Sequence, residues 1–241
     1  MALKVPASVQ TAQQNVAAGN LRAIVRNNLQ FLLARLEAKR VAVMRISKTT
    51  ITALLFLLPA LAGPACAAQT LSRIGLVLEG AYQQVGTTRI YDGSYRRLSF
   101  PGGDIPLERG VCSDVLVRAY RHAGLDLQVL VNQDMSRSFL SYPQLWGLSK
   151  PDPNIDHRRV PNLAEFFRRN GTTLPVSTRA GDYTAGDIVT WRLASGVPHI
   201  GLVSDRSQSG RPLMIHNIGA GAQVEDVLFT NVITGHYRYD P

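Results

Sequence analysis

One stretch of the sequence combines the start of a helix with a cysteine: RGVCSDVLVRAY, at residues 109–120. Its apolar residues recur at helical spacing until Gly124, which predicts a helix that packs by one face. The first turn of a helix presents unpaired N–H groups and the positive end of the helix dipole, and both can lower the pKa of a thiol. Cys112 is therefore a candidate nucleophile, provided that another side chain can accept its proton.

The segment at residues 44–68 has the layout of a secretory signal peptide. A short basic region precedes an apolar run at 51–61, and small residues follow up to Ala67 and Ala68, near which we expect cleavage. The apolar run is shorter than the roughly 20 residues of a membrane-spanning helix, so we expect membrane contact only through this N-terminal segment. An uncleaved anchor or a lipid on Cys66 is the alternative. Cleavage would release a periplasmic or secreted protein.

Residues 1–43 precede the signal peptide and take no part in the fold prediction. They are either an amphipathic extension or the product of a mis-assigned start, with Met44 as the true first residue. Basic charge is concentrated in residues 1–68, which hold 8 Lys or Arg and 1 Asp or Glu, whereas residues 69–241 hold 18 and 16. The net charge of +9 is thus no argument for nucleic-acid binding, and we expect no nucleic-acid partner.

Residues 69–241 have the length of a single domain with its own core. Apolar residues at helical spacing predict helices over 71–85, 112–124, 127–139 and 162–170. After Gly186 the apolar residues alternate, which predicts strands over 187–193, 199–204, 213–217 and 232–239. Residues 87–110 are expected to be irregular with one short strand, and residues 142–161 to form a loop. Helices followed by strands with short turns indicate an α+β domain, in which helices pack on an antiparallel sheet.

Two histidines lie on successive predicted strands. His199 opens one strand and His216 lies within the next, so an antiparallel pairing can bring both side chains to one face. His216 and Asn217 point to opposite faces, and only one of them can orient His199. A thiol nucleophile needs a base and a partner that fixes the tautomer of that base. Alternatively, Cys112 is an inert core residue and the histidines are structural.

A second polar group lies in the Pro-rich segment before residue 162. Asp152, Asp156 and His157 could ligate a metal, but the pattern is weak and we expect no metal site. His157, with Arg158 and Arg159, could instead contact an anionic group of a substrate.

The sequence resembles the NlpC-type cell-wall cysteine hydrolases in its motifs at 110–114, 119–120, 186–189, 199–203 and 215–217. The resemblance implies a papain-like core in which Cys112 is the nucleophile, His199 the base and His216 the orienting residue. It further implies cleavage of an amide bond in peptidoglycan or a peptide-like substrate through an acyl-enzyme, with no cofactor. Two alternatives are an acyltransferase or thioesterase, for which a hydrophobic groove should flank Cys112, and a cell-wall-binding module without activity.

Further motifs, at 91–93, 101–106, 142–143, 146–148, 154–163 and 234–239, resemble the bacterial YijF-like family, whose shared region is a domain of unknown function. Two positions differ from the NlpC-type pattern, which has Asp before the cysteine and Gly two residues after it; here these are Val111 and Asp114. A carboxylate so near the thiol opposes its ionisation unless it pairs with an arginine. Tyr91 is the candidate for the tyrosine that shapes the pocket of those enzymes. The expected substrate-binding residues are Tyr91, Asp114, His157 and Arg158.

Overall fold

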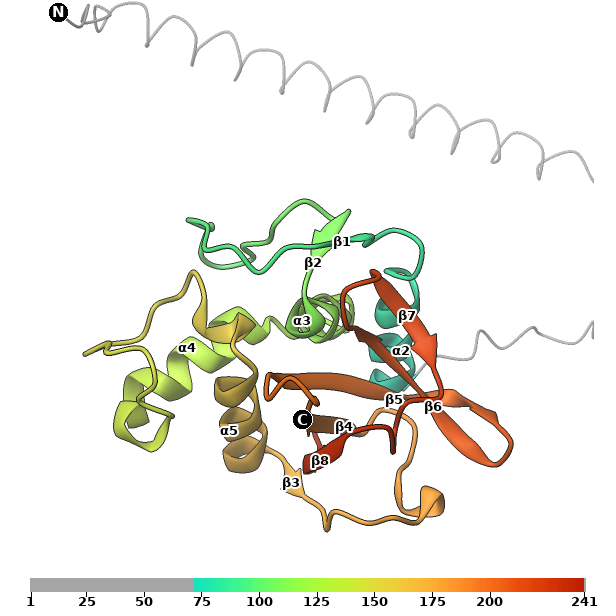
Figure 1. Ribbon diagram of the computed structural model, residues 1–241. Helices are drawn as coiled ribbons and strands as arrows, with labels where there is room; N and C mark the ends of the chain where they lie inside the picture. Colours follow the sequence, from blue (N-terminus) through green and yellow to red (C-terminus); the bar gives the residue numbers. More distant parts are fainter. Residues whose placement is uncertain (1–71, 241) are drawn as a thin grey trace, which may run out of the picture. The chain divides into compact units, whose positions relative to one another are not determined.

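Four α-helices and a six-stranded sheet form the framework of residues 72–240, the part of the chain that the computed structural model describes (Figure 1). The predicted extension at 1–43 and the predicted signal peptide at 44–68 lie outside the described residues. Within residues 72–240, every helix is too short or too polar to cross a membrane. The helices are α2 (Arg73–Tyr82), α3 (Cys112–His122), α4 (Leu127–Ser138) and α5 (Val160–Asn170), with single 3-10 turns at η1 (Phe139–Ser141), η2 (Asp156–Arg158) and η3 (Ala180–Asp182).

Side chains at the helix ends explain where the helices begin. Ser72 Oγ accepts a backbone N–H of the first turn of α2 at 3.1 Å, and the Asp126 carboxylate does the same for α4 at 3.1 Å. Helix α5 begins at Val160, earlier than the predicted start at residue 162, because Pro161 fits the first turn of a helix.

The sheet is antiparallel throughout and has the strand order β3-β8-β4-β5-β6-β7. Its strands are β3 (Thr172–Thr173), β4 (Ile188–Arg192), β5 (Pro198–Gln208), β6 (Arg211–Asn217), β7 (Ala222–Glu225) and β8 (Val232–Arg238). A separate parallel pair joins β1 (Ile90–Tyr91) to β2 (Arg109–Gly110). The predicted α+β class with helices and an antiparallel sheet is confirmed. Strand β7, which the sequence did not predict, proves important for the site.

Helix α3 lies at the centre of the main core. Its residues from Cys112 to Tyr120 are all buried, among α2, α4, η2 and the sheet. An aromatic cluster joins the far half of α3 to α5 and the end of the chain; it consists of Tyr120, Phe166, Phe167, Tyr237 and Tyr239. The Tyr120 hydroxyl also donates to the Tyr239 carbonyl at 3.0 Å. This packing fixes the first turn of α3 against the sheet.

The two faces of β5 belong to different clusters. Ile200 and Leu202 are part of the core that includes α3, whereas Val203 packs in a second apolar cluster with Trp191 and Met214. Successive side chains of a strand point to opposite faces. His199 therefore shares the face of Trp191, which is its partner in the register with β4.

Candidate active site

Cys112 is the first residue of α3, and its side chain lies against β5. The residue is 4% exposed and packs in the main core with Ile200 of β5. The thiol lies on the wall of a cleft of about 430 Å³. Cys112 is thus a buried thiol at the edge of a cleft, packed against Ile200, the residue that follows His199 in β5.

The pKa of Cys112 is set by its burial more than by its place at a helix start. Burial raises the pKa of the thiol to about 11, and the charge of Asp114 adds to the rise. The N–H groups of Ile200 and of the first turn of α3 lower it by less. Desolvation thus outweighs the lowering effect that a helix start can have, and the thiol is neutral near pH 7.

His199 and His216 are brought together by β5 and β6, as their order on successive strands predicted. His199 Nε2 lies 2.9 Å from His216 Nδ1, with the rings nearly perpendicular at 81°. Gly201 leaves the room for this contact, because a Cβ there would lie 3.1 Å from His216 Cβ and 3.3 Å from the Trp191 ring. His199 Nδ1 makes no hydrogen bond to any described residue and is the ring nitrogen available to a proton.

The structure decides between His216 and Asn217 as the partner of His199. Asn217 points to the opposite face and donates from Nδ2 to the Gly110 carbonyl at 3.0 Å, which ties β6 to the segment before Cys112. The second ring nitrogen of His216, Nε2, lies 2.9 Å from Oε2 of Glu225 on β7. Glu225 is the residue of the site that the sequence did not predict, since its strand is short and follows a Gly-rich turn.

Both histidines are neutral near pH 7. Burial, together with the neighbouring His216, lowers the pKa of His199 to about 3. Burial also lowers the pKa of His216, although the charge of Glu225 and the hydrogen bond to it act in the other direction. The resting site therefore contains a neutral thiol and two neutral imidazoles rather than a thiolate–imidazolium pair.

Asp114 and Arg158 form a buried ion pair behind the thiol. Arg158 donates from Nε and Nη2 to the two carboxylate oxygens at 2.8 and 2.9 Å, and the side chains are 2% and 4% exposed. Asp114 also accepts the N–H of Val111 at 2.7 Å, which caps the start of α3. The polar atoms of both residues are occupied within the protein, where they position the helix start and the loop before it, and Arg158 also lines the cleft that contains Cys112.

His157 is also buried rather than open to a substrate. It is 2% exposed, and burial lowers the pKa of its ring to about 4. Its Nδ1 has no hydrogen-bond partner among the described residues. The expected contact of His157 with a substrate is therefore not available in this structure, because the ring lies beneath the surface of η2.

Tyr91, by contrast, lies at the open side of the site. The residue is 45% exposed and lines the same cleft as Cys112. Burial of its hydroxyl raises the pKa of Tyr91 to about 12, and the charge of Cys112 and a hydrogen bond to it raise the pKa further. Tyr91 therefore lies on the same cleft as the thiol, with part of its side chain open to solvent.

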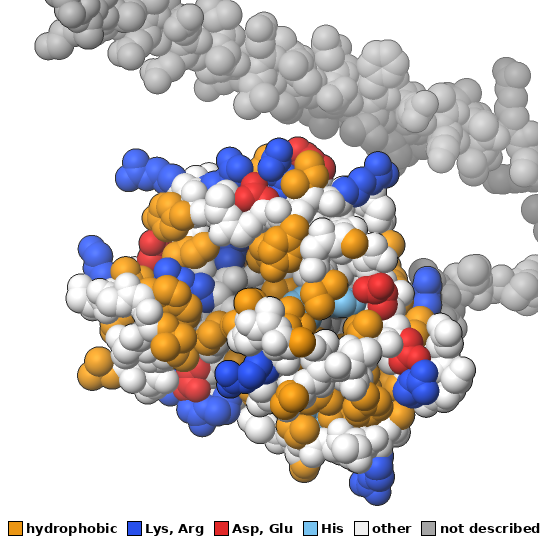
Figure 2. Space-filling model, viewed as in Figure 1, with side chains coloured by type: hydrophobic (Ala, Val, Ile, Leu, Met, Phe, Trp, Pro, Cys, Tyr) orange, Lys and Arg blue, Asp and Glu red, His pale blue; other side chains and the backbone are white. Residues whose placement is uncertain are grey.

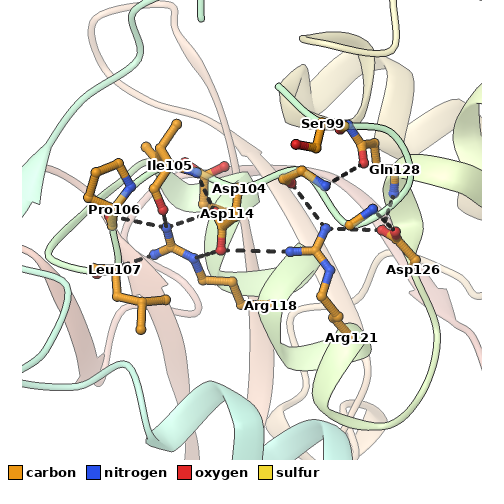
Figure 3. A network of polar contacts seen from close by, with 12 residues as sticks. Ser99, Asp104, Ile105, Pro106, Leu107, Asp114, Arg118, Arg121, Asp126 and Gln128 are labelled. Carbon is orange, nitrogen blue, oxygen red and sulfur yellow. Dashed lines mark hydrogen bonds and ion pairs between the residues drawn. The ribbon is translucent and has the colours of Figure 1, made fainter. Parts of the chain in front are cut away.

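A polar network holds the long segment between β1 and β2 against the helices (Figure 3). Arg118 of α3 donates to both carboxylate oxygens of Asp104 at 2.9 Å. One turn later Arg121 pairs with Asp126 at 3.0 Å, and Gln128 donates to the Ser99 carbonyl at 2.9 Å. Since this segment connects Tyr91 to the start of α3, the network fixes the position of Tyr91 relative to Cys112.

Two clefts meet beside the thiol and share one apolar wall, formed by Leu145, Val160, Pro161 and Pro198. The first contains Cys112 and Tyr91, and the second, of about 390 Å³, extends over β4 and β8. Figure 2 shows a histidine side chain at the bottom of a hollow rimmed by apolar side chains, with an acidic side chain beside it. The surroundings of the thiol are therefore mainly apolar.

The residues weighed as metal ligands form no metal site. Asp156 accepts the N–H of Asp152 and the guanidinium of Arg159, at 2.6 and 2.9 Å. Across residues 72–240, no three His, Cys, Asp or Glu side chains converge in a way that could hold a metal ion.

The comparisons with other proteins concern the region that contains this site. A family model described as a domain of unknown function (DUF1287) matches residues 78–239. The chain is also similar to the protein named Uncharacterized protein YijF of Escherichia coli (strain K12), with 58% identity over 164 residues, which cover 68% of this chain and 80% of the relative. The matched region includes α3 and all strands of the sheet. The chain therefore belongs to the DUF1287 family, the YijF-like family that its sequence motifs resemble.

Proposed function

We propose that this protein is a cysteine hydrolase with a papain-like core of the NlpC type, in which Cys112 is the nucleophile and His199 the base. The observation that carries the proposal is the 2.9 Å contact between His199 and His216, on the strands that adjoin a helix-start cysteine. A base held by a partner and a thiol in an open cleft are the parts that acyl transfer needs. The NlpC-type resemblance of the motifs supports the same assignment.

The reaction begins from neutral groups. His199 Nδ1 takes the proton from Cys112 Sγ while the sulfur attacks the carbonyl carbon, so that an S–C bond forms and the carbonyl π pair moves to oxygen. When the C=O bond re-forms, the C–N bond breaks and the amine leaves with the proton from His199. Water then attacks the thioester with His199 again as base, which releases a carboxylic acid and restores the thiol.

Charge on the carbonyl oxygen needs donors in the cleft. The backbone N–H of Cys112 belongs to the first turn of α3, whose N–H groups have no partner within the helix. The Tyr91 hydroxyl lies on the same cleft and supplies a second donor. Donors fixed in place before the reaction are effective because they need no reorganisation when charge develops.

The proposed substrate is an amide or peptide bond in peptidoglycan. This rests on the NlpC-type resemblance and on export through the signal peptide expected at residues 44–68, which would place the protein in the periplasm or outside the cell. The proposed chemistry uses the side chains of the protein and requires no cofactor. Nucleic acid is no partner in this proposal.

The test is incubation of the purified protein with peptidoglycan from several wall types, with released fragments identified by mass spectrometry. Wild type should release fragments with new amino termini, and Cys112→Ala and His199→Ala should release none. His122→Ala is the matched control, since His122 lies on α3 with its side chain 32% exposed and pairs with Glu79 away from the cleft. Full activity of Cys112→Ala would refute the mechanism, and wall binding without cleavage would identify a binding module instead.

A second candidate function is a thioesterase or acyltransferase, because apolar clefts flank Cys112 on the side of Leu145 and Pro198. An apolar acyl chain fits such a lining better than a polar peptide does. Hydrolysis of p-nitrophenyl esters from acetyl to decanoyl separates the two functions. Rates that rise with chain length, together with intact peptidoglycan, would favour the acyl substrate.

A further inference from the structure

Glu225 extends the line of contacts from His199 and His216 to the surface. The register places Gln223 of β7 opposite His216, and Glu225 lies two residues further on the same face of the strand. Its Oε2 lies 2.9 Å from His216 Nε2. The His216 side chain is 1% exposed and that of Glu225 is 40% exposed, so a solvent-accessible carboxylate ends a buried pair of imidazoles.

The chemistry of these groups allows the protons to be placed. An ionised carboxylate can only accept hydrogen bonds, so His216 Nε2 must carry a proton to donate to Glu225. In a neutral imidazole the other nitrogen is then bare, and His216 Nδ1 must accept from His199 Nε2. A neutral His199 that carries its proton on Nε2 has a bare Nδ1. This is the nitrogen that a base needs.

Without the carboxylate, the opposite arrangement satisfies the central contact equally well. His216 Nδ1 would donate to a bare His199 Nε2, and the proton of His199 would then occupy Nδ1. In that state His199 cannot accept a proton from the thiol.

We infer that Glu225 is a positioning residue, which fixes the tautomers of His216 and His199 so that Nδ1 of His199 is free to act as the base. This role rests on the proposed function of His199. The contacts of the pair agree with it: His199 Nε2 lies 2.9 Å from His216 Nδ1, and His216 Nε2 lies 2.9 Å from Glu225 Oε2. Glu225 itself touches neither the thiol nor the cleft that contains it.

The sharpest variant is Glu225→Gln. A glutamine side chain has the same shape, but its amide can either accept from His216 Nε2–H or donate to a bare Nε2. Both proton arrangements then keep every hydrogen bond, and we expect both to be populated to a comparable extent. Glu79→Gln is the matched control, because Glu79 is a 45% exposed glutamate that pairs with a histidine, His122, at 3.5 Å away from the site.

The test is ¹⁵N NMR of the full-length protein with labelled histidine, in which protonated and bare ring nitrogens have well-separated shifts. Wild type and Glu79→Gln should show His199 and His216 with protons on Nε2 alone. Glu225→Gln should show the Nδ1–H form of both rings as well. A proton on His199 Nδ1 in wild type, or tautomers unchanged by Glu225→Gln, would overturn the inference.

Activity provides a second and separable readout. If the protein cleaves peptidoglycan or esters, Glu225→Gln should lower kcat about twofold with little change in KM, since about half of the molecules then hold the tautomer that cannot act as a base. An unchanged kcat would contradict the role of Glu225. The NMR result needs no substrate, so the predicted tautomers in a protein without any hydrolytic activity would refute the proposed function and leave the tautomer assignment intact.

Discussion

Replacement of Arg158 by Leu tests whether the buried ion pair holds the start of α3. In the native protein Arg158 donates two hydrogen bonds to Asp114, and further bonds to the carbonyl groups of Ser94 and Asp92 at 3.1 and 2.8 Å. The variant leaves the Asp114 carboxylate 4% exposed with the Val111 N–H as its remaining partner. An uncompensated buried charge of this kind costs about 3–5 kcal/mol of the free energy of unfolding.

For a domain of this size, each kcal/mol lowers the midpoint of thermal unfolding by about 2–4 °C. Arg158→Leu should therefore lower Tm by about 6–20 °C, measured by circular dichroism and by urea unfolding. The double variant Asp114→Asn/Arg158→Leu should recover part of the loss, because it removes both charges. Arg168→Leu is the control, since Arg168 pairs with Glu165 on the surface, with its side chain 57% exposed, and should change Tm little.

Two outcomes would refute this reasoning. One is a Tm of Arg158→Leu close to that of wild type, which would mean that the carboxylate finds water or another partner. The other is a double variant no more stable than the single one, which would mean that the loss comes from packing of the Arg158 stem rather than from the unpaired charge.

Three further predictions concern the thiol, its neighbour and acid stability. Burial raises the pKa of Cys112 to about 11. The rate of alkylation by iodoacetamide should therefore rise about tenfold per pH unit from pH 7 to 10. A rate that stops rising below pH 8 would show a preformed thiolate instead. Tyr91→Phe should lower kcat about 10²-fold or more with Tm unchanged; equal turnover of the two proteins would exclude the hydroxyl as an oxyanion donor. Burial acts to raise the pKa of Asp187, but hydrogen bonds from Arg238 and His236 lower it overall. This carboxylate therefore stabilises the fold at pH values above its unfolded pKa near 3.9. The stabilisation is lost as the pH falls through the lower folded pKa. Asp187→Asn should therefore be less stable than wild type at pH 7 and lose less on acidification, and parallel urea midpoints from pH 7 to 3 would contradict this.

Local pattern was enough for the helices and for most of the sheet. The apolar spacing from residue 112 onward predicted α3, and the alternation after Gly186 predicted β4, β5, β6 and β8 because each of these strands has at least one buried face. Strand β7 escaped this reasoning. It has four residues and follows Gly219 and Gly221, which have positive φ, so its local sequence is typical of a turn. Only its pairing with β6 identifies it as a strand.

The sequence alone determined that Cys112 starts a helix and that His199 and His216 meet on successive strands, since the alternation of side chains follows from local spacing. Only the tertiary structure decided their electrostatic state and their partners. Burial raises the pKa of Cys112 by more than the helix start lowers it, and Arg158 forms an ion pair with Asp114. Glu225 contacts His216 from β7, a strand that the sequence pattern did not predict. Desolvation and pairing across the sheet depend on groups distant in the chain, and no local pattern contains them.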